Sequence, residues 1–454
     1  MPHQSQSRKR TVWYPLYTVG DLSSGIYAVT PGILLMFYMT SVLGIPVAVA
    51  TIASFVPKIV DLIAGPVIGA LSDRSTSKIG RRRSYVLYGG LTILPAFTLL
   101  WASPFTSPMW AATFVVLAFC LCSLCNTSFS VPYCALNAEI TTDYHDGTVL
   151  NSYRAFYSMV GCVIAGAGAP VLVEYFGGGR SGFFAMGATM AAIMATCILV
   201  TFFSSKEPKK SHVTTVPFKL PLVLKSIYSN KPYRTLMLAY FIHVIGSGIV
   251  SASLAFFVTY QLKQGADYLS LIFLLSFGSS VLMLPLFSML GRRRGKFTAY
   301  STAIGFTAVA MLGYFFLDDR SKLWQVLSVA VLAGFSEGGV QAFAYSMLSD
   351  SIRYGQENDT KLNSDAMMTG VFIAAEKLGM ASGAGIAGCI FLLTGLVETT
   401  SGYVHQPESA LQGIRLAASI APSVLNVIAL IVFSRYAKFD RLVHQIQLEP
   451  KRLV

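Results

Sequence analysis

The chain has 454 residues, of which 54% are hydrophobic and only 12% are charged. Soluble domains carry about 25% charged residues, so this composition excludes an ordinary soluble protein and indicates a membrane protein. The net charge of +13 could suit a nucleic-acid-binding protein, but the basic residues lie between apolar segments, as membrane topology requires. The seven cysteines lie inside apolar segments, which favours buried thiols over disulfides or a metal site.

Apolar runs long enough to cross a bilayer, roughly 20 residues each, recur along the whole chain. We predict twelve spans, at residues 14–41, 46–72, 84–103, 109–138, 149–177, 181–204, 234–261, 268–290, 297–317, 322–349, 365–395 and 411–434. The longest polar interruption separates the sixth run from the seventh. The expected fold is therefore an all-α membrane protein with two six-helix bundles. Its expected parts are a tail (1–13), an N-terminal bundle (14–204), a central loop (205–233), a C-terminal bundle (234–434) and a second tail (435–454).

Lysine and arginine are concentrated in alternate connections. They gather in both tails, in the central loop, and in the loops after the second and eighth spans, whereas the other connections are nearly bare. By the positive-inside rule, both termini and the central loop are expected to be cytoplasmic. The polar, basic start "MPHQSQSRKR" lacks the apolar core of a cleaved signal peptide. The positive charge is thus a topology signal, and no nucleic-acid partner is expected.

The two halves of the sequence resemble each other. The motif "GRRRSYVLYGG" opens the third predicted span and "GRRRGKFTAYS" opens the ninth. The end of the fourth span, "YCALNAEITTDYHD", is echoed by "YSMLSDSIRYGQEN" at the end of the tenth. Two similar halves with a central loop are typical of transporters, whose binding sites lie between the repeats near the bilayer midplane.

Charged residues also lie deep inside the predicted spans, namely Asp21, Lys58, Asp61, Arg154 and Lys377. With a helical rise of about 1.5 Å per residue, Asp61 lies roughly 16 Å from the cytoplasmic end of its span. Such charges usually face the bundle interior and pair with one another. One interpretation is a static ion-pair network between helices. The other is that Asp61, with or without Asp21, carries the coupling proton or cation, while Lys58 acts on it from the same helix face.

Other polar residues in the spans admit two interpretations each. His243 is either a hydrogen-bonded core histidine or a proton relay, and Glu337 is a candidate second titrating group. Tyr133, Tyr153 and Phe156 either pack in the core or stack on a ligand.

The stretch "KIVDLIAGPVIGALSDRSTSKIGRRRSYVL" resembles the second helix and following loop of the glycoside–pentoside–hexuronide:cation symporters, a branch of the major facilitator superfamily that includes melibiose permease. The stretches "GDLSSGIYAVTPGILLMFYMTSVLGIP", "NSYRAFYSMVG", "SDSIRYGQ" and "AAEKLGMASG" resemble its helices 1, 5, 10 and 11. The resemblance runs over most of residues 14–395. It implies a major facilitator fold, cation-coupled solute transport and a working monomer.

Position by position, the resemblance makes Asp61 a cation-site acid, Lys58 the base that precedes it, and Asp21 an acid that contacts sugar. Arg154 and Lys377 match bases of the family's fifth and eleventh helices. The sequence departs from the family at three places. Gly65 stands where the family has its second cation-site acid, Ser130 where it has an acid that binds sugar, and Cys134 where it has a tryptophan that stacks on the sugar. Losing a carboxylate weakens a sodium site but still permits a proton, so H⁺ is favoured over Na⁺. The changed sugar contacts predict a less polar solute, or a different sugar held by Asp21, Arg154 and Lys377.

The sequence thus predicts a secondary transporter of a bacterial inner membrane. It would symport a cation and a sugar, glycoside or related organic solute by alternating access, with no cofactor. The alternative in the same fold is a proton-driven exporter of a drug, lipid or natural product. Residues of the basic loops either latch cytoplasmic helix ends or simply anchor the topology: Asp73, Arg74, Arg81, Arg82, Arg83, Arg292, Arg293 and Arg294. The chain contains none of the nucleophile, zinc or P-loop motifs that would favour an enzyme, and its off-centre charges do not fit the charged rings of a channel.

Overall fold

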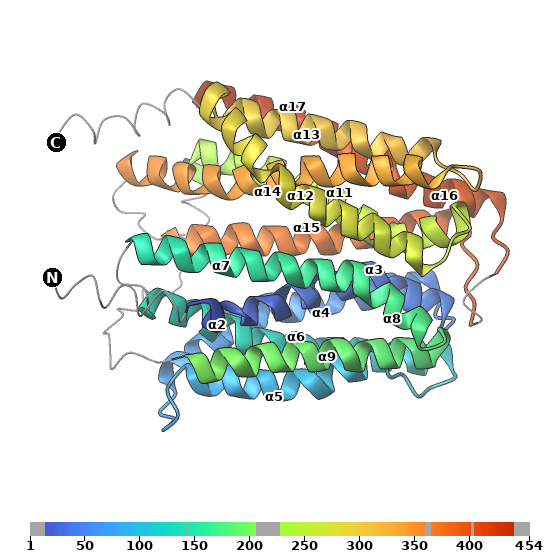
Figure 1. The fold of residues 1–454 in the computed structure, drawn as a ribbon, viewed down its shortest axis with the longest axis horizontal. Coiled ribbons are helices and arrows are strands. Elements are labelled where there is room, and N and C mark those ends of the chain that lie inside the picture. Colours follow the sequence, from blue (N-terminus) through green and yellow to red (C-terminus); the bar gives the residue numbers. More distant parts are fainter. Residues whose placement is uncertain (1–13, 141–143, 206–227, 359–364, 401–403, 440–454) are drawn as a thin grey trace. The chain divides into compact units, whose positions relative to one another are not determined.

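Long helices follow the apolar runs of the sequence in the computed structural model (Figure 1). The structure describes residues 14–140, 144–205, 228–358, 365–400 and 404–439. Across these ranges the regular secondary structure is entirely helical, and eleven helical segments are long and apolar enough to cross a membrane. The protein is therefore an all-α, multi-pass membrane protein.

The chain forms two compact units. Unit 1 comprises residues 1–214, 265–270 and 396–406. Its described helices are α2 (Tyr14–Thr18), α3 (Gly20–Ser41), α4 (Val47–Arg74), α5 (Arg83–Leu100), α6 (Pro108–Ile140), α7 (Tyr144–Val163), the π-helical turn η1 (Ile164–Gly168), α8 (Ala169–Tyr175) and α9 (Gly179–Ser204).

Unit 2 comprises residues 215–264, 271–395 and 407–454. Its described helices are α11 (Lys231–Phe256), the π-helical turn η2 (Phe257–Gln261), α12 (Ala266–Arg294, whose first turn belongs to unit 1), α13 (Lys296–Gly313), the 3₁₀ turn η3 (Tyr314–Phe316), α14 (Leu323–Asn358), α15 (Asp365–Leu393), α16 (Glu408–Ala418) and α17 (Ile420–Ser434).

Helix α5 corresponds to the third predicted span, residues 84–103. It is 18 residues long, begins at Arg83, and is not among the eleven apolar segments found in the described residues. The charged first residue and the early end at Leu100 leave a shorter apolar stretch than the sequence pattern suggested.

In unit 1, glycines bring α3 and α7 into direct backbone contact. A Cβ atom on Gly25 would lie 2.2 Å from the carbonyl oxygen of Ser158, and one on Gly161 would lie 2.2 Å from that of Leu22. Small residues let membrane helices approach this closely and gain van der Waals contact. The crossing lies one turn from Asp21 on α3 and about two turns from Arg154 on α7, so it fixes how these two side chains meet.

Unit 2 contains a crossing of the same kind between α11 and α15. A Cβ atom on Gly248 would lie 2.5 Å from the carbonyl oxygen of Met380, and one on Gly383 would lie 2.2 Å from that of Ile245. Each unit thus pairs its first long helix with a later helix through glycines on both partners. The two halves of the sequence repeat this packing device as well as their loop motifs.

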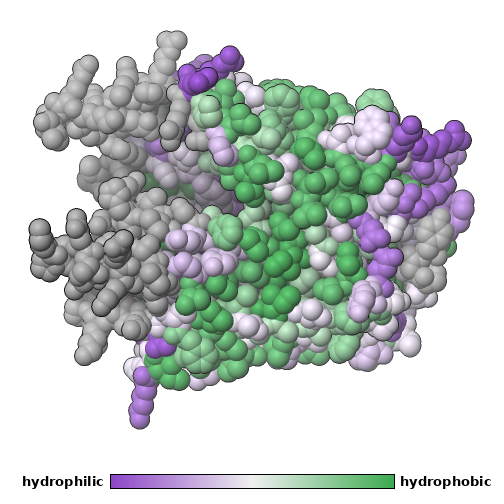
Figure 2. Space-filling view, in the orientation of Figure 1, coloured by the Kyte–Doolittle hydropathy of each residue, from purple (hydrophilic) through white to green (hydrophobic). Residues whose placement is uncertain are grey.

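Hydrophobic side chains make up both the core and much of the outer surface. In unit 1, the rings of Tyr38, Trp101 and Phe183 pack together, with centroids 4.8–5.7 Å apart. In unit 2, Tyr300 and Phe433 belong to the buried core. Many large apolar side chains are nevertheless exposed, and Figure 2 shows hydrophobic residues over much of the face in view. An exposed apolar surface of this extent suits a lipid environment.

Candidate functional site

Asp21 is the centre of a hydrogen-bonded cluster in unit 1. Its carboxylate accepts hydrogen bonds from Arg154 Nε at 2.9 Å, from Arg154 Nη2 at 3.2 Å and from the Tyr133 hydroxyl at 2.6 Å. The Arg154 guanidinium also lies over the Tyr133 ring, 5.2 Å from its centroid. The side chain of Asp21 is 8% exposed and that of Arg154 is 24% exposed. Helices α3 and α7 thus form a bidentate, largely buried ion pair, and α6 adds the tyrosine hydroxyl.

Two further predicted solute-site residues lie on α6 beside this cluster. Cys134 is exposed, and its Sγ atom accepts a hydrogen bond from Arg154 Nη2 at 3.4 Å. Ser130 is half-buried, one helical turn before Cys134. The exposed edge of the Asp21 cluster is thus lined by a guanidinium, a thiol and, one turn away, a hydroxyl.

Asp61 and Lys58 lie on α4 and contact α3 and α6. Asp61, 6% exposed, accepts a hydrogen bond from the Thr127 hydroxyl of α6. The Lys58 ammonium lies 5.7 Å from the ring centroid of Tyr27 on α3 and 5.4 Å from that of Phe119 on α6. Aromatic faces partly compensate a cation for lost water. At Gly65, one turn after Asp61, an added Cβ would meet nothing within 4 Å, so no crowding requires glycine there.

Two predicted residues of unit 2, His243 and Glu337, lie together with Asn426. His243 Nε2 is 3.4 Å from Glu337 Oε1, and His243 Nδ1 is 2.7 Å from Asn426 Oδ1. The side chain of His243 is 1% exposed and that of Glu337 is 33% exposed. Helices α11, α14 and α17 each contribute one residue to this group.

Lys377 lies on α15 of unit 2 and is exposed. Glu376, the residue before it, is half-buried and accepts a hydrogen bond from the Tyr345 hydroxyl of α14. A second polar contact, between Tyr345 and Glu376, thus joins α14 to α15 in unit 2.

The basic residues proposed as a latch have different surroundings. Arg83 donates from Nε to Ser205 Oγ at 3.0 Å and from Nη2 to the Phe202 carbonyl oxygen at 3.2 Å, which ties the start of α5 to the end of α9. Arg82 is buried and Arg81 half-buried, whereas Arg74, Arg293 and Arg294 are exposed. The side chains of Asp73 and Arg292 lie outside what the structure describes.

Two ion pairs of unit 2 lie near helix ends. Lys296, at the start of α13, contacts Asp350 of α14 at 2.6 Å, which joins the repeated motifs "GRRRGK" and "YSMLSDS". In the loops at the other end of the helices, Lys263 lies 2.8 Å from Asp319 and lowers the pKa of that exposed carboxyl by hydrogen bonding and charge attraction.

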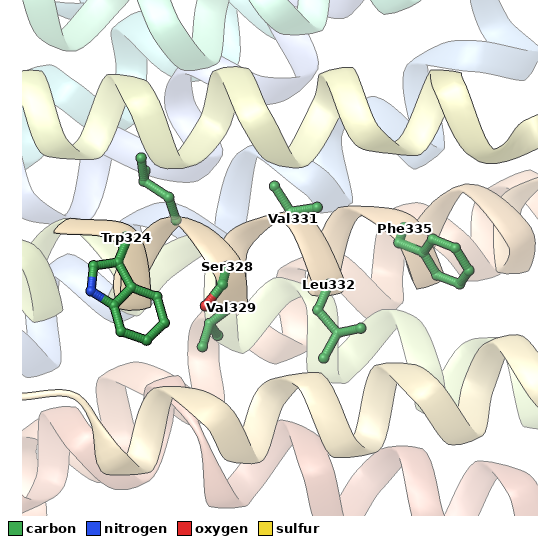
Figure 3. A pocket seen from close by; sticks show the side chains of 7 residues that line it. Trp324, Ser328, Val329, Val331, Leu332 and Phe335 are labelled. Carbon is green, nitrogen blue, oxygen red and sulfur yellow. The ribbon is translucent and has the colours of Figure 1, made fainter. Parts of the chain in front are cut away.

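A shallow pocket on α14 is separate from these polar groups (Figure 3). Its lining is apolar except for the Trp324 indole N–H and the Ser328 hydroxyl, which donates to the Gln325 carbonyl oxygen. Leu332 and Phe335 also line it. None of the predicted site residues lines it. Its composition suits a hydrocarbon chain better than a polar solute.

Sequence reasoning did not assign Thr127 or Asn426 to a site, and it left open whether Tyr133 packs or binds. All three are neutral polar residues inside apolar helices, so the sequence alone does not identify their partners. The one available sign in the sequence is weak: each is a side chain that can form hydrogen bonds, placed inside an apolar span of a chain that also buries charged residues.

Long apolar helices that hold charged clusters are typical of a multi-pass membrane protein. The family model described as "MFS/sugar transport protein" matches residues 16–438, so the chain belongs to that family. The inner membrane symporter YicJ of Escherichia coli (strain K12) is 24% identical over 425 residues, covering 92% of this chain and 90% of the relative. The isoprimeverose transporter of Lactiplantibacillus pentosus is 25% identical over 458 residues, covering 96% and 89%. These matches confirm the predicted resemblance to cation symporters of the major facilitator superfamily.

Solved structures share the fold. A bacterial homolog of the human lysosomal transporter Spinster, in an inward-facing and unoccupied conformation, superimposes with a TM-score of 0.68 at 11% identity, covering 95% of this chain and 97% of that one. At this identity the likeness shows the fold alone.

Proposed function

We propose that this protein is a cation-coupled symporter of a sugar, glycoside or related organic solute, with H⁺ as the coupling ion rather than Na⁺. The proposed unit of function is a monomer in a bacterial inner membrane. It has twelve transmembrane helices, both termini in the cytoplasm, and bundles at residues 14–204 and 234–434 that alternate access. Support comes from the family, from the names of the relatives, and from charged residues held inside the helices. The relatives reported above are named symporters or transporters, and neither name favours an exporter.

The observation that carries the proton assignment is the surroundings of Asp61. Among the contacts described for Asp61 is one hydroxyl, that of Thr127, and a lysine lies one helical turn away at Lys58. A hard metal cation prefers several oxygen atoms and little positive charge, so these groups favour a proton. Gly65 contributes no side-chain oxygen. A single carboxylate can still accept and release a proton when a neighbouring base and its exposure change between two conformations.

We assign the solute to the exposed edge of the Asp21 cluster. The carboxylate of Asp21 and the guanidinium of Arg154, which bond to each other, present charged hydrogen-bond acceptors and donors to hydroxyl groups. Ser130 and Cys134 extend this edge. Lys377 stays a predicted solute-binding residue on the family resemblance alone. Glu337 and His243 are not needed for this assignment.

Uptake into membrane vesicles with an imposed gradient tests the proposal. Isoprimeverose and a panel of other sugars and glycosides should include a solute whose saturable uptake is driven by an inward pH gradient, without a requirement for Na⁺. Asp61→Asn should reduce this gradient-driven uptake to the level of vesicles that lack the protein. Asp319→Asn, the same substitution in an exposed loop, should leave uptake unchanged. Full gradient-driven uptake by Asp61→Asn would refute the role of Asp61.

A further inference from the structure

Asn426 fixes where one proton lies on the ring of His243. Asn426 Nδ2 donates to the Pro422 carbonyl oxygen at 2.8 Å, and Asn426 Oδ1 lies 2.7 Å from His243 Nδ1. A carbonyl oxygen can only accept, so the amide directs its nitrogen to Pro422 and its oxygen to the imidazole. His243 Nδ1 must therefore carry a hydrogen atom to make this contact, whether the ring is neutral or charged.

The second ring nitrogen of His243 faces a carboxylate. Nε2 lies 3.4 Å from Glu337 Oε1. With Nδ1 protonated, a neutral ring offers only a lone pair at Nε2, and an ionised carboxylate offers only acceptors. The lone pair of Nε2 and the carboxylate repel each other, and little water screens the repulsion because the His243 side chain is only 1% exposed. One added proton between them turns the repulsion into an ion pair. We expect this proton on the ring, because imidazole binds protons more tightly than a carboxylate, with reference pKa values of about 6.5 and 4.3.

The neighbouring helices bring one further carboxylate and two phenols near this ring. Glu376 of α15 is a second carboxylate that acts electrostatically on His243. The buried phenol of Tyr300 on α13 interacts electrostatically with Glu337. The ring of Tyr240 on α11 stacks against the His243 ring, with the centroids 6.2 Å apart. Helix α17 carries no charged residue. Lys377, the base next to Glu376 on α15, is exposed.

We propose that His243, Glu337 and Asn426 form a proton-binding site of unit 2, distinct from Asp61, which holds one proton on His243 Nε2 at neutral pH. Protons exchange through Glu337, whose side chain is 33% exposed while that of His243 is 1% exposed. Asn426 is the positioning residue, because it keeps Nε2 turned toward the carboxylate. The site is argued from contacts within unit 2 and does not rest on the proposed transport function.

Nitrogen NMR of the purified full-length protein with ¹⁵N-labelled histidine tests this site without any solute. The chain has six histidines, so the His243 signals can be assigned by their loss in His243→Gln. At about pH 7.5, where an ordinary imidazole of pKa about 6.5 is mostly neutral, both ring nitrogens of His243 should be protonated. In Glu337→Gln the imidazolium signal should be lost, and a neutral ring with its proton on Nδ1 should replace it. In Asn426→Leu, those His243 rings that are neutral should carry their proton on either nitrogen, because no amide oxygen then fixes it on Nδ1.

Glu376→Gln is the matched control, since it removes a nearby negative charge without removing a hydrogen bond to His243. The His243 imidazolium should persist in this variant. If His243→Gln does not fold, the signal that changes in Glu337→Gln but not in Glu376→Gln supplies the assignment. A wild-type His243 that is neutral at this pH would overturn the proposal, as would an imidazolium that persists in Glu337→Gln.

Discussion

Arg154 makes it possible for the carboxylate of Asp21 to lie inside a membrane helix. A charge at this depth is costly by itself, but here it accepts three hydrogen bonds, two of them from a guanidinium. Removing one partner of a buried ion pair leaves the other uncompensated, whereas removing both does not. The ion pair therefore predicts a specific pattern of stabilities.

We expect Arg154→Met to lower the free energy of unfolding by about 2 kcal/mol. This is less than the roughly 3–5 kcal/mol typical of a fully buried pair, because Arg154 is 24% exposed. The double variant Asp21→Asn/Arg154→Met should recover part of that loss. Thermal melting of the purified proteins measures both. A double variant that is less stable than Arg154→Met alone would show that the ion pair is not the source of the effect.

Thr127 has a similar role beside Asp61. Thr127→Val keeps the shape of the side chain but removes the hydroxyl that donates to the carboxylate. Hydrogen bonds to charged groups contribute about 1.5–3 kcal/mol, and we expect a loss of that order. Thr127→Ser, which retains the hydroxyl, is the control and should melt close to the wild type. In an Asp61→Asn background the effect of Thr127→Val should shrink; an undiminished effect there would mean that Thr127 acts on something else.

At the level of the helices, glycine determines whether the side chains of the Asp21 cluster can meet. An alanine at position 161 would place its Cβ 2.2 Å from the carbonyl oxygen of Leu22, so α3 and α7 would have to separate. Asp21 and Arg154 lie on these two helices and would separate with them. The ion pair is thus a consequence of the crossing as well as of the two charges.

We expect Gly161→Ala to destabilise the protein by about 1–3 kcal/mol, the usual cost of overpacking, and to impair solute uptake. Gly32→Ala, on α3 itself, is the matched control, because a Cβ there meets nothing within 4 Å. That control should be as stable as the wild type. Melting temperatures and vesicle uptake of the two variants provide the comparison, and equal behaviour would show that the α3–α7 crossing can relax.

The hydropathy of the sequence predicted where the helices lie, but it did not predict which helices and side chains contact one another. The apolar runs predicted the long helices because a bilayer demands about 20 apolar residues per span, and α5 (Arg83–Leu100) covers most of the third predicted span. The buried charges were likewise visible as exceptions to that demand. Thr127, Asn426 and the glycine crossing were not assigned, because their roles depend on which helices touch, and a single sequence does not reveal this.

At the level of the whole molecule, the proposed function requires a proton and a solute to cross the membrane together. The chain belongs to a transport family, and its two halves repeat loop motifs and a glycine crossing. Asp61 is the proposed coupling carboxylate, and the cluster around Asp21 is the proposed solute contact. Symport, unlike export by proton exchange, requires both species to move in the same direction.

The pH of a weakly buffered medium around de-energised, right-side-out vesicles tests this claim most directly. Addition of isoprimeverose, or of another solute that the vesicles take up, should make the medium more alkaline, because protons enter with the solute. The change should be abolished by a protonophore and be absent in Asp61→Asn. Acidification of the medium would indicate exchange, and uptake that depends on Na⁺ without any pH change would contradict the proton assignment.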